Sequence, residues 1–124
     1  MDRTFIIVGA LVMFLAVALG AFGAHALEVY FSEKLDLKSS YETAVRYQMI
    51  HGLAIFIVAW LVSRWDSSLL STAGWLFLAG IILFSGSLYI MSLTDQRWLG
   101  AVTPIGGLAF LAGWLLVAIA AWRH

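Results

Sequence analysis

The chain has 124 residues, of which 63% are hydrophobic and 11% are charged, whereas ordinary soluble domains carry about 25% charged residues. A water-soluble domain of this size cannot bury so much apolar surface, because a small chain buries only about two-thirds of the surface it exposes when unfolded. Seven basic and seven acidic side chains balance, and cysteine is absent, which argues against a nucleic-acid partner, disulfides and thiolate chemistry. The composition therefore predicts an integral membrane protein.

Charged residues divide the sequence into four long uncharged stretches. A helix needs about 20 predominantly apolar residues to cross the hydrocarbon core of a bilayer. Short links between such helices favour antiparallel neighbours, and hence an all-α, up-down four-helix bundle. We expect a single transmembrane domain over residues 1–124. Its predicted membrane-spanning helices lie near residues 4–27, 40–63, 68–94 and 98–122.

The second helix is expected to begin near residue 40. Ser39 followed three residues later by Glu42 matches a capping box, in which each side chain bonds a backbone N–H at the start of a helix. Residues 28–39, just before this point, mix charged and apolar side chains. This mixture is typical of a segment that lies along the membrane surface. A short interfacial segment is therefore predicted between the first and second helices.

Small residues recur within the predicted helices. In lipid, helices gain little from hydrophobicity when they associate, so close contact depends on residues that let the backbones approach. We expect Gly20 and Gly107 to lie at such contacts. The glycines assigned to helix packing in this way are Gly20, Gly23, Gly86, Gly106, Gly107 and Gly113.

Polar residues within the predicted spans gather toward one half of the bundle. His25 lies near the end of the first span, Gln48 and His51 near the start of the second, and Tyr89 toward the end of the third. Because successive helices run in opposite directions, these four side chains are expected to converge near the membrane face that carries the interfacial segment. Others expected in the same half are Tyr47, Ser85, Thr103 and Pro104.

This polar cluster has several interpretations. Its side chains can hydrogen-bond one another and fix the helix register, at about 1 kcal/mol or less per contact. Alternatively, His25 and His51 hold a haem iron or a quinone head group, or the cluster forms a proton or small-solute pathway, since ionisable residues at membrane depth are functional candidates. Two histidines without a third ligand fall short of a catalytic zinc site. Catalytic motifs are absent, so we predict a non-enzymatic protein without a cofactor or metal.

Four motifs occur in a fixed order and point to a known family. They are GAFGAHAL at 20–27, YQxxH at 47–51, FSGSLY at 84–89 and TPIGG at 103–107, followed by Gly113 and Trp114. Over essentially the whole chain, the sequence resembles the family catalogued as domain of unknown function 423, which includes YgdD-like and YwdK-like proteins and is related to transmembrane protein 256. The resemblance implies a four-span inner-membrane protein of unassigned activity. Some members are associated with membrane integrity and stress tolerance, which implies a role in membrane organisation.

The orientation in the membrane is weakly marked. Three basic residues fall on one side of the predicted bundle and four on the other. This difference is too small for the positive-inside rule to assign the cytoplasmic side. An even number of spans places both termini on one side, which we assign to the cytoplasm. The expected partners are the lipid bilayer and either a second copy of the chain or another membrane protein, with no nucleic acid.

Overall fold

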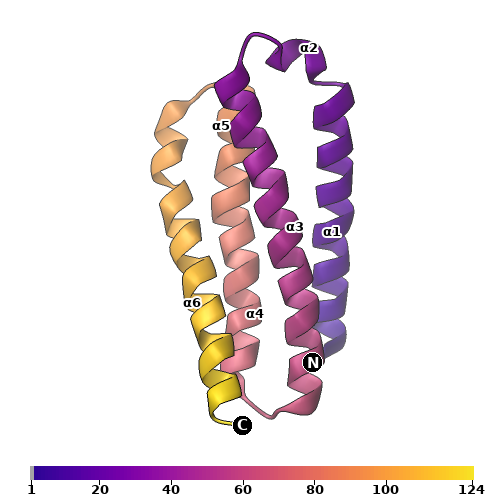
Figure 1. Ribbon diagram of the computed structural model, residues 1–124, viewed down its shortest axis with the longest axis vertical. Helices are drawn as coiled ribbons and strands as arrows, with labels where there is room; N and C mark the ends of the chain where they lie inside the picture. The colour runs from indigo at the N-terminus through magenta and orange to yellow at the C-terminus, as the bar shows by residue number, and fades with distance from the viewer. Residues whose placement is uncertain (1) are drawn as a thin grey trace.

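The computed structural model describes residues 2–124 and the side chains from residue 3 onward. Its four long helical segments lie side by side and are called rods below: Arg3–His25, Leu35–Arg64, Ser68–Thr94 and Arg97–Trp122 (Figure 1). Because the rods alternate in direction, the start of α1 and the end of α6 lie at the same end of the bundle (Figure 1). The elements in chain order are α1 (Asp2–His25), α2 (Glu28–Phe31), α3 (Leu35–Arg64), α4 (Ser68–Gly80), the π-helical segment η1 (Ile81–Ser85), α5 (Gly86–Thr94), the 3-10 helical segment η2 (Arg97–Ala101) and α6 (Thr103–Trp122).

Each rod is long and apolar enough to cross a bilayer. The shortest has 23 residues and therefore measures about 35 Å, more than the ~30 Å of a typical hydrocarbon core. Residues 2–124 form helices and turns without a strand, so the predicted all-α fold with four membrane-spanning helices is confirmed. The four membrane-capable segments are Arg3–His25, Leu35–Arg64, Ser68–Thr94 and Arg97–Trp122.

The second rod begins at Leu35 rather than at residue 40. Ser39 lies inside α3, where its backbone carbonyl accepts a hydrogen bond from the Thr43 hydroxyl at 2.9 Å, so the predicted capping box with Glu42 is wrong. Asp36 stands instead in the first turn, where a carboxylate suits the positive end of the helix dipole. The charge-free stretch thus marks the apolar part of the span, whereas the helix itself continues beyond it into a polar zone.

The link between α1 and α3 folds over the end of the bundle. Its short helix α2 packs Phe31 against Tyr41 and the first turns of α3, and both rings are buried. The Tyr30 hydroxyl donates a hydrogen bond to the backbone carbonyl of Ser92 at 2.9 Å, which ties the link to α5 as well. The segment predicted over residues 28–39 is therefore shorter than expected, and it is anchored to the protein.

The second and third rods occupy the middle of the molecule, and α1 and α6 lie outside them. Helix α1 packs mainly on α3, and α6 mainly on α4 (Figure 1). Accordingly, 22% of the most apolar stretch of the first and fourth spans is buried, against 44% in the second and third. The outer helices thus present most of their surface to lipid. The main apolar core between the rods consists of Phe5, Val12, Ala54, Ile55, Val58, Ala59, Ala73, Phe77, Ile81 and Phe110.

Several glycines allow close packing between rods. A Cβ added to Gly106 would overlap the backbone nitrogen of Phe84, so α6 and η1 lie in backbone contact at this point. A Cβ on Gly23 would overlap the ring of Tyr41, and one on Gly113 would lie 2.6 Å from the Phe77 ring. In membranes, where the hydrophobic effect gives helices little reason to associate, such close contacts at glycine supply the packing that holds them together.

The remaining predicted glycine contacts are looser. A Cβ on Gly20 would meet Val45 at 3.4 Å, an ordinary van der Waals contact between α1 and α3, which agrees with the prediction. At Gly107 the nearest atom belongs to the Phe84 ring at 3.9 Å, and at Gly86 nothing lies within 4 Å. Gly107 thus lies at an ordinary contact between α6 and η1, whereas the expectation that Gly86 serves helix packing is wrong.

Candidate functional site

Gln48 is the centre of a hydrogen-bonded network that joins three helices. Its side chain, 4% exposed on α3, donates from Nε2 to the backbone carbonyl of Val12 on α1 at 2.9 Å. Its Oε1 accepts a hydrogen bond from the Tyr89 hydroxyl on α5 at 2.5 Å. A buried polar group left without a partner costs about 1–3 kcal/mol. The amide is thus stable only when α1, α3 and α5 keep this register.

Two further pairs join the rods at neighbouring positions. The Ser85 hydroxyl in η1 donates to the backbone carbonyl of Ala44 on α3 at 2.7 Å. The hydroxyls of Ser87 on α5 and Thr103 at the start of α6 lie 2.6 Å apart. In the part of the chain that the structure describes, every buried side-chain nitrogen or oxygen has a hydrogen-bond partner. Most of the polar residues expected in this half are therefore paired within the protein.

His51 lies one turn after Gln48 on α3 and has separate partners. Its Nδ1 is 2.9 Å from the backbone oxygen of Tyr47, and its Nε2 is 3.0 Å from the indole nitrogen of Trp114 on α6. A carbonyl can only accept and an indole N–H can only donate. The imidazole therefore carries its proton on Nδ1 and accepts at Nε2. Its ring also stacks on Phe110, with centroids 3.6 Å apart.

The structure does not bring His25 to the other three predicted residues. The His25 side chain is exposed at the end of α1. Since Gln48 bonds to Val12 and Gly52 faces Met13, His51 lies near the level of residue 13. His25 is twelve residues further along α1, or roughly 18 Å at 1.5 Å per residue.

This separation corrects the predicted convergence of His25 with His51. The prediction measured the depth of His51 from Arg46, as if that charge marked the membrane boundary. Helix α3 instead begins at Leu35, and Gly23, near the end of α1, packs on Tyr41. Consequently, no haem or quinone site can use both histidines, because a ligand held between them needs both at similar depth.

An open groove of about 530 Å³ runs along the outside of the bundle between α3, η1 and α6. Its volume falls within the range of about 300–1,000 Å³ that is common for small-molecule sites. The paired His51 and Trp114 form part of its wall, and Gly107 leaves its middle open. Pro104 lies at one end, in the first turn of α6, where a missing N–H is tolerated. The lining residues are Tyr47, His51, Phe84, Pro104, Gly107, Leu108, Phe110, Leu111 and Trp114.

The π-helical segment η1 shapes one wall of this groove. A π-helical turn contains an extra residue compared with an α-helical turn, and such turns are frequent at functional sites. Here the Phe84 ring lines the groove while the next residue, Ser85, bonds to α3. Gly106 lets α6 lie directly on the Phe84 backbone. The irregular turn therefore supplies both a wall of the groove and a link between helices.

Sequence reasoning identified some of the groove residues and missed others. Trp114 carried a signal that was not used: it is one of six tryptophans, and the other five lie near predicted span ends. An indole N–H placed within the hydrocarbon needs a partner, which here is His51. Phe110 gave no such signal, because its stacking on His51 follows only from the packing of α6.

Taken together, these features define a small four-span membrane protein with internally paired polar residues and an aromatic groove on its lipid-facing side. A family model described as "Protein of unknown function (DUF423)" matches residues 19–107, and the chain belongs to this family. This confirms the resemblance found in the motifs.

Curated relatives match along nearly the whole chain. The chain is 50% identical to a UPF0382 membrane protein of Staphylococcus haemolyticus over 121 residues, which cover 98% of this chain and 97% of the relative. It is 47% identical to UPF0382 membrane protein YwdK of Bacillus subtilis over 123 residues, 98% of each chain. No solved structure matches the chain significantly.

Proposed function

We propose that the protein is a non-enzymatic component of the cell membrane that affects the organisation of the bilayer by holding a lipid acyl chain in its groove. The groove itself carries this proposal. Two of its lining side chains, Leu108 and Leu111, are 65% and 67% exposed, so the groove opens toward the lipid. Its His51 and Trp114 nitrogens are already paired, so an occupant needs no polar group. An acyl chain is the apolar ligand that the bilayer supplies at this depth.

The internal pairing of the polar residues supports a non-catalytic role. A catalytic or transport site needs polar groups that can bind a substrate or pass it on. The amide of Gln48 and the hydroxyls of Ser85 and Tyr89 are instead bonded between helices. Recruiting any of them to a substrate would cost a bond that holds the rods in register.

The proposal places the protein in the cell membrane with both termini in the cytoplasm. The relatives are named membrane proteins, and the two ends of the described chain share one end of the bundle (Figure 1). Reporter fusions that are active only in the cytoplasm, joined after His124, test this orientation. An active fusion at the loop between α3 and α4 is expected as well, whereas one in the link between α1 and α3 should be inactive.

Filling the groove tests the lipid-binding function. In Gly107→Phe, the new ring occupies the middle of the groove without meeting any backbone, so the fold should persist. Leu115→Phe is a matched control, because Leu115 is 61% exposed on the same helix and lies outside the groove. Native mass spectrometry of protein released from its membrane is expected to show fewer retained phospholipids for Gly107→Phe than for the wild type or Leu115→Phe.

The cellular arm uses a strain that lacks the protein. Entry of a membrane-impermeant dye is expected to increase in this strain and to return to normal with the wild type or Leu115→Phe, but not with Gly107→Phe. Equal lipid retention by the two variants, or full rescue by Gly107→Phe, would contradict the proposal.

A further inference from the structure

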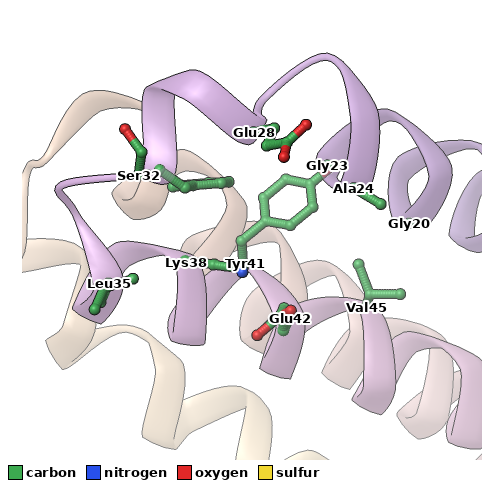
Figure 2. Close-up of a pocket in the computed structure, with 11 residues that line it drawn as sticks. Gly20, Gly23, Ala24, Glu28, Ser32, Leu35, Lys38, Tyr41, Glu42 and Val45 are labelled. Carbon is green, nitrogen blue, oxygen red and sulfur yellow. The ribbon is translucent and has the colours of Figure 1, made fainter.

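A second cavity, of about 540 Å³, lies where α1 ends and the first turns of α3 begin, beneath α2 (Figure 2). The Tyr41 ring stands in its centre in Figure 2, close to the labelled end of α1. Tyr41 is 2% exposed, its ring fills the notch at Gly23, and its hydroxyl donates to the backbone carbonyl of Leu19 at 2.5 Å. The Tyr41 ring is therefore a fixed part of the cavity wall, and Gly20, which has no side chain, leaves the cavity room.

Three charged side chains line this cavity: Glu28 from α2, and Lys38 and Glu42 from α3. Within the described residues, none of the three makes a side-chain hydrogen bond or an ion pair. Lys38 and Glu42 are one turn apart, but the order with lysine first is the less favourable one for a helical pair. The cavity thus offers two carboxylates and one ammonium group that are free to bind.

The rest of the lining is apolar and lies deeper along the helices. Gly20 precedes Gly23 by nearly a turn of α1, and Val45 follows Tyr41 by a turn of α3, so both lie on the side of the cavity nearer the membrane core. Glu28 and Lys38 stand at the outer side, and Glu42, one residue beyond Tyr41 on α3, lies between them and the apolar part. This gradient from charge to apolar surface, at the end of a membrane span, matches the junction of a phospholipid headgroup with its acyl chains.

We propose that this cavity binds a phospholipid whose headgroup carries a primary ammonium beside its phosphodiester, as an ethanolamine headgroup does. The ammonium group lies between the carboxylates of Glu28 and Glu42, and the phosphodiester lies at Lys38. A primary ammonium offers three N–H donors, and its bonds to carboxylates are charge-assisted and therefore strong. The site is separate from the groove between α3 and α6, so this inference goes beyond the proposed function and can fail independently of it.

The same chemistry disfavours the other common headgroups. A quaternary ammonium has no N–H to donate, and it would depend on an aromatic face. The two rings in the lining, Tyr41 and Phe31, pack on each other with centroids 5.5 Å apart, and Tyr41 also contacts Tyr89 at 5.2 Å. An anionic headgroup without an amine meets two carboxylates and only one ammonium. We therefore expect the order ethanolamine, then choline, then glycerol headgroups.

Native mass spectrometry with added lipids of identical acyl chains tests this order. The wild-type protein is titrated with phosphatidylethanolamine, phosphatidylcholine and phosphatidylglycerol. In Glu28→Gln/Glu42→Gln, binding of the ethanolamine lipid is expected to weaken about tenfold, equivalent to ~1.4 kcal/mol, and its preference over the choline lipid should disappear. Lys38→Gln is expected to weaken both zwitterionic lipids, since both contain the phosphodiester.

Two controls separate this site from general electrostatics and from the groove. Glu33→Gln removes a carboxylate from the same link outside the cavity and should keep the ethanolamine preference, as should Gly107→Phe. The thermal midpoint of each variant in detergent shows that it is folded. Equal binding of ethanolamine and choline lipids by the wild type, an unchanged preference in the double variant, or full competition by soluble phosphoethanolamine would overturn the proposal.

Discussion

The two halves of the bundle hold their helices together by different means. In the half toward α2, which we call the polar half, hydrogen bonds from Gln48, Ser85 and Trp114 cross between rods. In the half toward the termini, the apolar half, aromatic rings sit on glycines, as Phe5 does on Gly74. Apolar contact alone gives helices little reason to associate in lipid. The apolar half therefore depends on the fit of shapes, whereas the polar half adds the pairing of specific atoms to contacts such as that of Tyr41 on Gly23.

The two candidate lipid sites both lie in the polar half. The groove beside His51 and the cavity around Tyr41 lie on opposite sides of the α3 stretch between them. Hydrogen bonds keep the rods in register there, while the room for ligands comes from residues without bulk such as Gly107 and Gly20. In the apolar half, rings fill the space that the glycines leave, as Phe5 does at Gly74.

The largest effect is expected from breaking the fit in the apolar half. In Gly74→Leu, the new side chain overlaps the Phe5 ring, which is fully buried and also packs on Trp75 at 5.2 Å between centroids. Overpacking of a well-filled core costs about 1–3 kcal/mol and sometimes more. We expect the unfolding free energy in detergent to fall by about 3 kcal/mol. Thermal unfolding followed by circular dichroism measures it.

A matched control for this change is Gly86→Leu. Nothing lies within 4 Å of a Cβ at Gly86, so its substitution should change stability by about 0.5 kcal/mol or less. Equal losses in the two variants would show that glycine packing does not distinguish the apolar half.

A smaller effect is expected from breaking the pairing in the polar half. Gln48→Leu leaves the Tyr89 hydroxyl and the Val12 carbonyl without their partner. Interhelical hydrogen bonds in membranes contribute about 0.6 kcal/mol on average and up to about 1.7, so we expect a loss of about 1–2 kcal/mol. In a double-mutant cycle with Tyr89→Phe, the double variant should be more stable than the sum of the single losses predicts.

Strict additivity in this cycle would mean that Gln48 and Tyr89 do not interact, and the assignment of a network would fail. The cycle is measured with the same thermal unfolding assay as the glycine variants. The loss of unfolding free energy should be larger for Gly74→Leu than for Gln48→Leu. The ratio of these two losses is the quantity that distinguishes the two halves.

The sequence predicts the polar half better than it predicts the sites. The lengths of the uncharged stretches alone indicate four spans. The opposite directions of α3 and α5 correctly place Gln48 beside Tyr89. The separation of His25 from His51 could not be obtained in this way, because α3 begins at Leu35 and the charge at Arg46 is a wrong reference for the depth of His51. Likewise, the groove depends on how Phe84 is turned by a π-helical segment, and neither hydrophobic periodicity nor glycine spacing indicates such a turn.

The smallest effect is expected at the pair of His51 and Trp114, which lies where the polar half meets the groove. His51→Phe keeps an aromatic ring against Phe110 and removes the acceptor for the Trp114 N–H together with the Nδ1–H donor to the Tyr47 carbonyl. The second loss should matter little, because within the helix that carbonyl still accepts the backbone N–H four residues on. Because Trp114 is 39% exposed along the groove, its indole is less isolated than a fully buried donor. The loss of unfolding free energy should therefore be about 0.6 kcal/mol, the average for such bonds.

This variant also separates a structural role of His51 from ligand recognition. If the imidazole only fixes the position of the Trp114 ring, His51→Phe should retain as many phospholipids in native mass spectrometry as the wild type does, and Trp114→Phe should lose no further stability when the two changes are combined. If the imidazole recognises a polar ligand, the retained lipid should fall while the thermal midpoint hardly changes. The second outcome would contradict an acyl chain as the occupant, because a hydrocarbon chain offers the imidazole nothing to bind.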